Sequence, residues 1–250
     1  MRTYQVVRSK TAKTGVLLKD PGLDRYIPET ELYSRENLAR MLNKYKYVYV
    51  KPDCGRGGNK VISINLDDGG SCSIHYDTRI LKGKTVAEAA ALVERISAGA
   101  PFIIQQGIKL LTINNVPFDL RVNVQKPFNR WEVTAMIARL RAPGKAVTNF
   151  CQGGRLVELK QAFTLAGLKP QACDRLKALL TFIGEKTAAA LCRKYPHLRE
   201  LGLDIGLDRQ ARPWIFEVNT RPQYVRGLDE KFDRYHRLIE QSTVKKYQTK

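Results

Sequence analysis

The 250-residue chain lacks the features on which several common kinds of protein depend. Its five cysteines are scattered and never form Cys-x-x-Cys, which argues against a disulfide framework or a zinc site. No apolar run approaches the 18 residues that cross a membrane, and the N-terminus has no apolar core of the signal-peptide kind. We therefore expect a soluble, cytoplasmic protein.

Acidic residues are also scarce, since 24 Asp and Glu face 43 Lys and Arg and give a net charge of +19. A positive field of this size attracts anions such as nucleotides, acidic peptides, nucleic acid and anionic polymers. The basic residues are spread along the chain, and no zinc finger or RNP-type motif occurs. Binding of nucleic acid or of an anionic polymer is therefore kept as an alternative.

Helical and strand patterns alternate along the chain without an internal repeat. Helices are expected at 34–44, at 85–98 behind a Thr85/Glu88 capping box, at 174–194 and from about 229. Strands are expected at 47–51, 60–65, 71–76, 101–106, 118–126, 131–141, 203–207 and 214–218. This mixture predicts an α+β protein with two lobes.

A glycine-rich loop follows the first of these strands in "YVYVKPDCGRGGNKVISI". Lys51 ends the strand, and Gly55, Gly57 and Gly58 precede the next one. Glycines allow backbone N–H groups to approach an anion, and the lysine adds a positive charge. The segment is not a Walker A motif and, taken alone, also fits an ordinary hairpin turn.

Two carboxylates and an amide form a second pattern in "LGLDIGLDRQARPWIFEVNTRPQ". A hairpin register that pairs Leu207 with Trp214 places Asp204 opposite Glu217, and Asn219 projects from the same face. Such an oxygen-rich cluster suits Mg²⁺ with phosphate oxygens completing its shell. The alternative is a solvated polar face.

Strict alternation in "FDLRVNVQ" predicts a strand with one polar face. Asp119, Arg121, Asn123 and Gln125 share that face. A solvent-facing strand has the same pattern, but an arginine there can also clamp phosphate or carboxylate.

In this order, the motifs resemble those of the ATP-grasp superfamily, most closely its YheC/YheD-like branch of spore-coat-associated proteins. They are "VKP" with the glycine loop, "QQGI", "DLR", "TN" followed by "GG", and "D…E-x-N-T-R-P". The resemblance implies two α+β lobes that grip ATP, without most of the usual N-terminal pre-ATP-grasp domain. It divides the chain into an N-terminal segment (1–30), a small glycine-loop lobe (31–108) and a large lobe with the Mg²⁺ and phosphate site and a C-terminal helix (109–250).

The resemblance also implies roles for individual residues. The implied nucleotide-binding residues are Lys10, Lys51, Gly55, Gly57, Gly58, Gln105, Gln106, Gly107 and Ile108, the last four forming the hinge that reads adenine. Lys13 remains an alternative to Lys10 as the first phosphate-contacting lysine. Asp204, Glu217 and Asn219 are the implied Mg²⁺ ligands, while Arg121, Asn149 and Arg221 would face the transferred phosphoryl group or the acyl substrate. Where many relatives carry a ribose-binding acid, this chain reads "KLLTIN".

The implied reaction is ATP-dependent activation of a carboxylate as an acyl phosphate, followed by attack of an amine or thiol with release of ADP and phosphate. Small-molecule or peptide substrates are expected, with acidic ones favoured by the charge, and a partner protein could supply substrate recognition. Phosphoryl transfer needs positioning and charge neutralisation rather than a covalent nucleophile. The three histidines are therefore interpreted as structural or surface residues. The alternative is a spore-coat-associated structural protein that keeps the fold without turnover.

Overall fold

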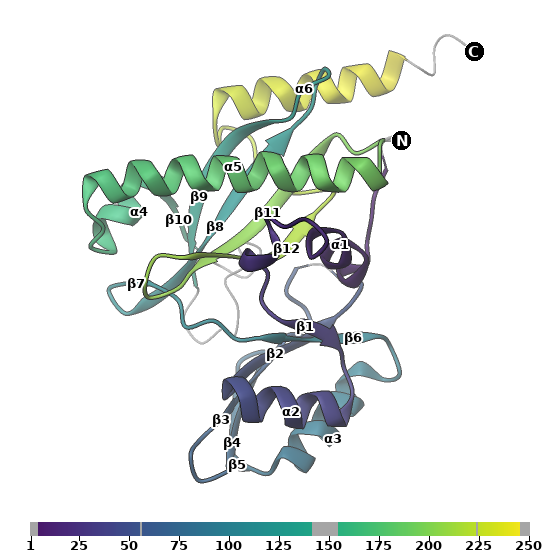
Figure 1. Cartoon of the computed structure of the whole chain (residues 1–250), viewed down its shortest axis with the longest axis vertical. Coiled ribbons are helices and arrows are strands. Elements are labelled where there is room, and N and C mark those ends of the chain that lie inside the picture. Colours follow the sequence, from purple (N-terminus) through teal and green to yellow (C-terminus); the bar gives the residue numbers. More distant parts are fainter. Residues whose placement is uncertain (1–4, 56, 142–154, 224, 246–250) are drawn as a thin grey trace.

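The computed structural model describes residues 5–55, 57–141, 155–223 and 225–245. These residues form two lobes, each built on an antiparallel sheet with its own hydrophobic core (Figure 1). Within the described ranges, no helix has both the length and the apolar character that a membrane crossing requires. The predicted α+β architecture is confirmed.

The small lobe is a six-stranded sheet in the order β1-β6-β2-β3-β4-β5. Its strands are β1 (Thr30–Leu32), β2 (Tyr47–Pro52), β3 (Ile62–Leu66), β4 (Cys72–Tyr76), β5 (Arg79–Lys84) and β6 (Phe102–Gln106). Two helices, α2 (Arg35–Tyr45) and α3 (Val86–Ser97), pack against it and close the smaller core. Both begin as the sequence predicts, because the Ser34 hydroxyl caps α2 and Thr85 and Glu88 form the capping box of α3.

The large lobe has a sheet in the order β10-β9-β8-β11-β12, with β7 paired to β8. Its strands are β7 (Thr112–Ile113), β8 (Val116–Gln125), β9 (Glu132–Leu140), β10 (Arg155–Glu158), β11 (Glu200–Leu207) and β12 (Pro213–Asn219). Its helices are α4 (Leu159–Leu165), α5 (Pro170–Lys194) and α6 (Glu230–Lys245). Helix α5 starts four residues earlier than predicted because Pro170, which lacks an N–H, occupies the first helical turn.

The two faces of the large sheet differ in character. Val122 and Val124 are fully buried in the core. On the other face Asp119, Asn123 and Gln125 are also buried, with exposed fractions of 4%, 2% and 0%. The solvent-facing interpretation of this strand is therefore wrong. Helix α6 covers the Gln125 end of the polar face, where its residue His236 lies 3.2 Å from Glu200.

The N-terminal segment is divided between the lobes. It contains a short helix that the sequence pattern did not predict, α1 (Lys10–Leu17), and a single 3₁₀ turn, η1 (Asp24–Tyr26). Leu17, Leu23 and Ile27 pack into the large-lobe core, whereas β1 pairs with β6 in the small lobe. Residues 10–27 thus build the large lobe even though they precede the small one in sequence.

The β11–β12 hairpin contains a bulge, and part of its register therefore differs from the predicted one. Leu207 pairs with Pro213 and Gly206 with Trp214, rather than Leu207 with Trp214. The register then shifts at Phe216, so that Asp204 lies opposite Glu217 as predicted. The extra residue in β12 is the physical reason, because a bulge changes which faces the flanking residues occupy.

Candidate functional site

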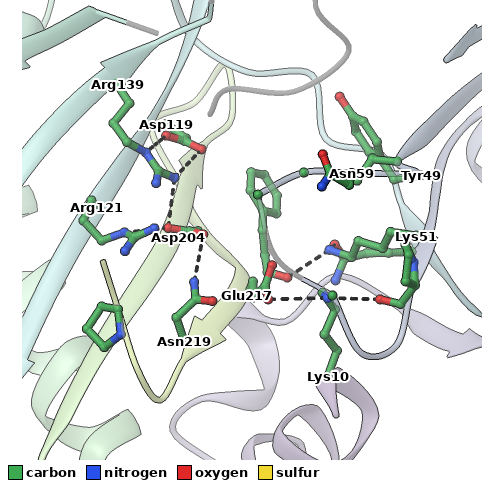
Figure 2. A pocket seen from close by; sticks show the side chains of 18 of the residues that line it. Lys10, Tyr49, Lys51, Asn59, Asp119, Arg121, Arg139, Asp204, Glu217 and Asn219 are labelled. Carbon is green, nitrogen blue, oxygen red and sulfur yellow. Dashed lines mark hydrogen bonds and ion pairs between the residues drawn. The ribbon is translucent and has the colours of Figure 1, made fainter. Parts of the chain in front are cut away.

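A cavity of about 750 Å³ opens between the lobes (Figure 2). Twelve of the fifteen residues singled out in the sequence line it: Lys10, Lys51, Gly55, Gly57, Gly58, Gln105, Ile108, Arg121, Asp204, Glu217, Asn219 and Arg221. Gln106 and Gly107 lie just outside the lining, and Asn149 falls outside the described residues. Motifs separated by more than two hundred positions therefore converge on one space.

Two lysines contact both lobes at the cavity. Lys51, at the end of β2, donates from Nζ to Gln105 Oε1 at 2.8 Å and to the Phe216 carbonyl at 3.2 Å. Lys10, at the start of α1, donates to the Pro52 carbonyl at 3.0 Å and lies 3.5 Å from Glu217 Oε1. Burial lowers the pKa of Lys51 to about 8, although the Glu217 carboxylate partly opposes this shift.

Lys13 is placed differently from Lys10. Its Nζ donates to the carbonyls of Val7 and Arg8, at 2.9 and 3.4 Å, and it is absent from the cavity lining. Burial lowers its pKa to about 8 as well. Of the two candidates for the first phosphate-contacting lysine, Lys10 is the one that faces the cavity.

The glycine loop is a hairpin connection between β2 and β3 whose backbone lines the cavity. Gly57 and Gly58 have φ values of 74° and 71°, a left-handed conformation that side chains disfavour. Asn59, which follows them, points toward the cavity beside Tyr49 (Figure 2). The hairpin and anion-loop interpretations of this segment are thus compatible.

Asp204 lies at the centre of a charged network. Its Oδ1 accepts from Arg121 Nε at 2.8 Å and from Arg139 Nη2 at 2.9 Å, and its Oδ2 accepts from Asn219 Nδ2 at 3.2 Å (Figure 2). Removal from water opposes ionisation of Asp204, but the two arginine charges outweigh it and lower the pKa of the carboxyl. Asp204 is therefore held as a carboxylate.

Sequence reasoning missed Arg139. Its guanidinium also forms two hydrogen bonds of 2.8 Å with Asp119, and both side chains are buried. The signal was present, since alternation in "IARLR" predicts the same side for Arg139, in β9, and Arg141, the residue after β9, and both line the cavity. The lining then holds six basic side chains and three carboxylates, a balance that favours a polyanionic ligand.

The predicted hinge, Gln105 to Ile108, consists of the last two residues of β6 and the two that follow it. The Gln106 N–H donates to the Glu29 carbonyl and the Gly107 N–H to the Tyr47 carbonyl, both at 2.8 Å. A Cβ at Gly107 would lie 2.4 Å from the Tyr47 ring, so only glycine fits. Ile108 lines the cavity, and its N–H bonds to no backbone carbonyl of the described residues. The Ile108 N–H is thus a candidate donor to a ligand.

The donor set fits a hard divalent cation. Asp204 and Glu217 supply carboxylates, and Asn219 supplies an amide oxygen after its Nδ2 has bonded Asp204. Mg²⁺ prefers oxygen ligands of this kind and commonly keeps water and phosphate in its remaining positions. Among the described residues, no group of three His, Cys, Asp or Glu side chains is arranged to hold a metal ion.

A family model described as "YheC/D like ATP-grasp" matches residues 4–246. The chain belongs to this family. The endospore coat-associated protein YheD of Bacillus subtilis (strain 168) is 29% identical over 220 residues, which cover 83% of this chain and 46% of YheD. The chain therefore spans about half the length of this relative.

Solved structures share the ATP-grasp fold. D-alanyl-alanine synthetase A from Vibrio cholerae has a TM-score of 0.58 at 12% identity, over 96% of this chain and 65% of that one. N5-carboxyaminoimidazole synthase from Aspergillus clavatus, solved with ADP, has a TM-score of 0.57 at 11% identity, over 94% of this chain and 51% of that one. At these identities the likeness establishes the fold, and the chemistry must be argued from the site.

Proposed function

We propose that this YheC/D-like ATP-grasp protein binds ATP with Mg²⁺ between its lobes and uses it to join a carboxylate to an amine or thiol. The observation that carries the proposal is the convergence of Lys10, Lys51, the glycine loop and the Asp204–Glu217–Asn219 set on one cavity. Each part meets a different need of phosphoryl transfer, namely a phosphate cradle, positive charge and oxygen ligands for a cation.

The cavity lining combines apolar and charged side chains, as a site for ATP requires. Tyr49, Ile108, Leu110 and Phe216 are its large apolar and aromatic members, and we propose that the flat base lies against them. Lys10, Lys51 and the backbone of Gly55, Gly57 and Gly58 would hold the phosphates. Asp204, Glu217 and Asn219 would hold Mg²⁺, which supplies charge neutralisation at the phosphate oxygens.

In the first step, a carboxylate oxygen of the acid attacks the γ-phosphorus as the bond to the β,γ-bridging oxygen breaks, giving an acyl phosphate and ADP. Arg121 and Arg221 orient the acid and the γ-phosphoryl oxygens, and Asn149 keeps the assisting role that the family resemblance implies. In the second step, the amine attacks the carbonyl carbon, loses a proton to solvent and expels inorganic phosphate. The arginines contribute by stabilising negative charge without changing protonation.

The basic lining favours an acidic small molecule or acidic peptide as one substrate. Because the chain spans about half of YheD, a partner protein or further domain could complete substrate recognition. The endospore-coat association of YheD supports a spore-associated setting for this protein.

The experiment that tests the proposal is calorimetric titration of ATP, with and without Mg²⁺, into the wild type and an Asp204→Asn/Glu217→Gln variant. We expect Mg²⁺-dependent binding that is lost in the variant, followed by ADP release once an acid and a nucleophile are both supplied. Formation of AMP and pyrophosphate would contradict the acyl-phosphate route. Nucleotide binding without any single-turnover transfer from labelled ATP would instead favour the structural alternative.

A further inference from the structure

On strand β11, small and acidic residues alternate along the face from which Asp204 lines the cavity. Gly202, Asp204 and Gly206 are two residues apart and therefore share one face of the strand. Neither glycine has a positive φ, in contrast to turn glycines such as Gly57 and Gly70. The backbone at these two positions suits any residue, so the reason for glycine lies in the space above it.

Arg121 fills the space above Gly202. A Cβ at this position would lie 2.8 Å from Arg121 Nη1 and 3.3 Å from its Cδ, and also 2.8 Å from the Pro222 Cβ. These separations are shorter than ordinary van der Waals contact. The missing side chain therefore leaves room for the Arg121 side chain next to Gly202, from where its Nε reaches Asp204 Oδ1 at 2.8 Å.

The Phe216 ring fills the space above Gly206. A Cβ there would lie 2.3 and 2.4 Å from two ring carbons of Phe216 and 2.6 Å from Leu110 Cδ2. Phe216 is the extra residue of the β12 bulge, and it lines the cavity together with its neighbour Glu217. In a regular strand, adjacent residues point to opposite faces, so the bulge and Gly206 together place the ring and the carboxylate on the same side.

We propose that Gly202 and Gly206 are positioning residues for opposite ends of the nucleotide, with Gly206 seating the Phe216 ring that the base contacts and Gly202 seating the Arg121 guanidinium at the phosphate end. This inference rests on the proposed ATP site. It explains why one strand carries two glycines whose φ values do not call for glycine, each beneath a different cavity-lining side chain. Substitution at the two positions must therefore affect different parts of the ligand.

The test measures affinity for two probes, AMP and ATP with Mg²⁺, in Gly206→Ala, Gly202→Ala and the wild type. AMP reports mainly on the base end, and the ratio of the two affinities reports on the phosphate and cation end. For Gly206→Ala we expect both probes to bind about tenfold more weakly, a loss equivalent to about 1.4 kcal/mol. For Gly202→Ala we expect unchanged AMP affinity and a smaller advantage of Mg²⁺-ATP over AMP, because only ATP carries the γ-phosphoryl group that Arg121 orients.

Gly15→Ala is the matched control, because a Cβ there meets no heavy atom within 4 Å and the residue lies in α1 away from both glycines. This control should bind both probes as the wild type does. Equal weakening of both probes in Gly202→Ala would overturn the inference for that residue, since it would indicate a general packing defect. Wild-type affinity of Gly206→Ala for AMP would overturn it for the other.

A second variant covers the case in which Gly206→Ala does not fold. In Gly206→Ala/Phe216→Leu, a smaller leucine side chain replaces the ring that the new methyl group would meet. We therefore expect this double variant to unfold cooperatively at a higher urea concentration than Gly206→Ala. Failure of the double variant to recover stability would contradict the steric relation. A folded wild type that binds neither probe would contradict the proposed function itself, while the urea comparison would still decide the steric relation.

Discussion

At the scale of single residues, burial changes the pKa of Lys51 in a way that favours binding of an anion. Lys51 is 8% exposed, and among the described residues its ammonium donates to two uncharged acceptors, the Gln105 side chain and the Phe216 carbonyl. Loss of water disfavours the charged form and lowers its pKa to about 8. A phosphate group would replace the missing hydration with negative charge, and binding would raise the pKa again.

This shift predicts the pH dependence of nucleotide binding. As the pH rises through about 8, Lys51 of the free protein loses its proton, so binding must be coupled to proton uptake. We expect affinity for Mg²⁺-ATP to fall above pH 8, by up to about tenfold per pH unit. Titration calorimetry from pH 6.5 to 9.5 measures this, and a Lys51→Met variant should bind more weakly and show a flatter profile. An equally steep profile in that variant would assign the effect to another group such as Lys13.

The Asp119–Arg139 pair predicts a large effect on stability. Asp119→Ala removes two hydrogen bonds from a buried guanidinium, which then keeps Asp204 as its carboxylate partner. We expect the free energy of unfolding to fall by about 3 kcal/mol, because an incompletely compensated charge remains buried. Urea denaturation measures the loss. The paired change Asp119→Leu/Arg139→Leu should cost less than the single one, and a larger loss would show that the charges themselves stabilise the fold.

At the scale of secondary-structure elements, the β12 bulge determines which residues of the hairpin face the core and which face the site. It lets Ile215 and Val218, three positions apart, both enter the large-lobe core. It also leaves the Phe216 carbonyl available to Lys51 at 3.2 Å. One additional residue therefore couples the packing of β12 to the position of a phosphate-contacting lysine.

Deletion of Phe216 tests the role of the bulge. Ile215 and Glu217 would then continue a regular ladder opposite Ile205 and Asp204, so the alternation of faces is preserved. We expect cooperative unfolding with a free-energy loss below about 2 kcal/mol, together with weaker AMP binding than in the wild type. Urea denaturation and calorimetry measure the two quantities. Unchanged AMP affinity would show that the bulge serves packing alone.

At the scale of the whole molecule, two separate cores are joined by the residues that the nucleotide would contact. Lys51 extends from the small lobe to the β12 backbone, and Lys10 extends from a large-lobe helix to the small-lobe residue Pro52. Binding of Mg²⁺-ATP should therefore stabilise both lobes together. At a free ligand concentration 100 times the Kd, the free energy of unfolding should rise by about 2.7 kcal/mol.

Hydrogen exchange measured with and without Mg²⁺-ATP checks this expectation lobe by lobe. Added protection in the glycine loop, β2 and β12 is the expected result, and Asp204→Asn/Glu217→Gln should abolish it. Protection confined to one lobe would contradict a site shared between them. Gly15→Ala again serves as a control that should behave like the wild type.

Much of the site could be predicted from sequence because its parts are local patterns. A lysine before a glycine loop, a capping box and the spacing of Asp204, Glu217 and Asn219 are each set within a few residues or one hairpin. Helix α1 was missed because its apolar pattern is short, with Leu17 as its one fully buried apolar residue. Strand β5 was missed because "RILKGK" is exposed along its length and lacks alternation.

By itself the sequence determined the two-lobed α+β character, most element positions, the pairing of Asp204 with Glu217 and the excess of positive charge. Only the tertiary structure decided that Lys10 rather than Lys13 faces the cavity, that Arg139 joins the Asp204 network and that Phe216 bulges over Gly206. The physical reason is the separation along the chain over which each effect acts. Periodicity and capping act between near neighbours, whereas side-chain direction and available space depend on residues that meet only when the two lobes and their sheets have packed.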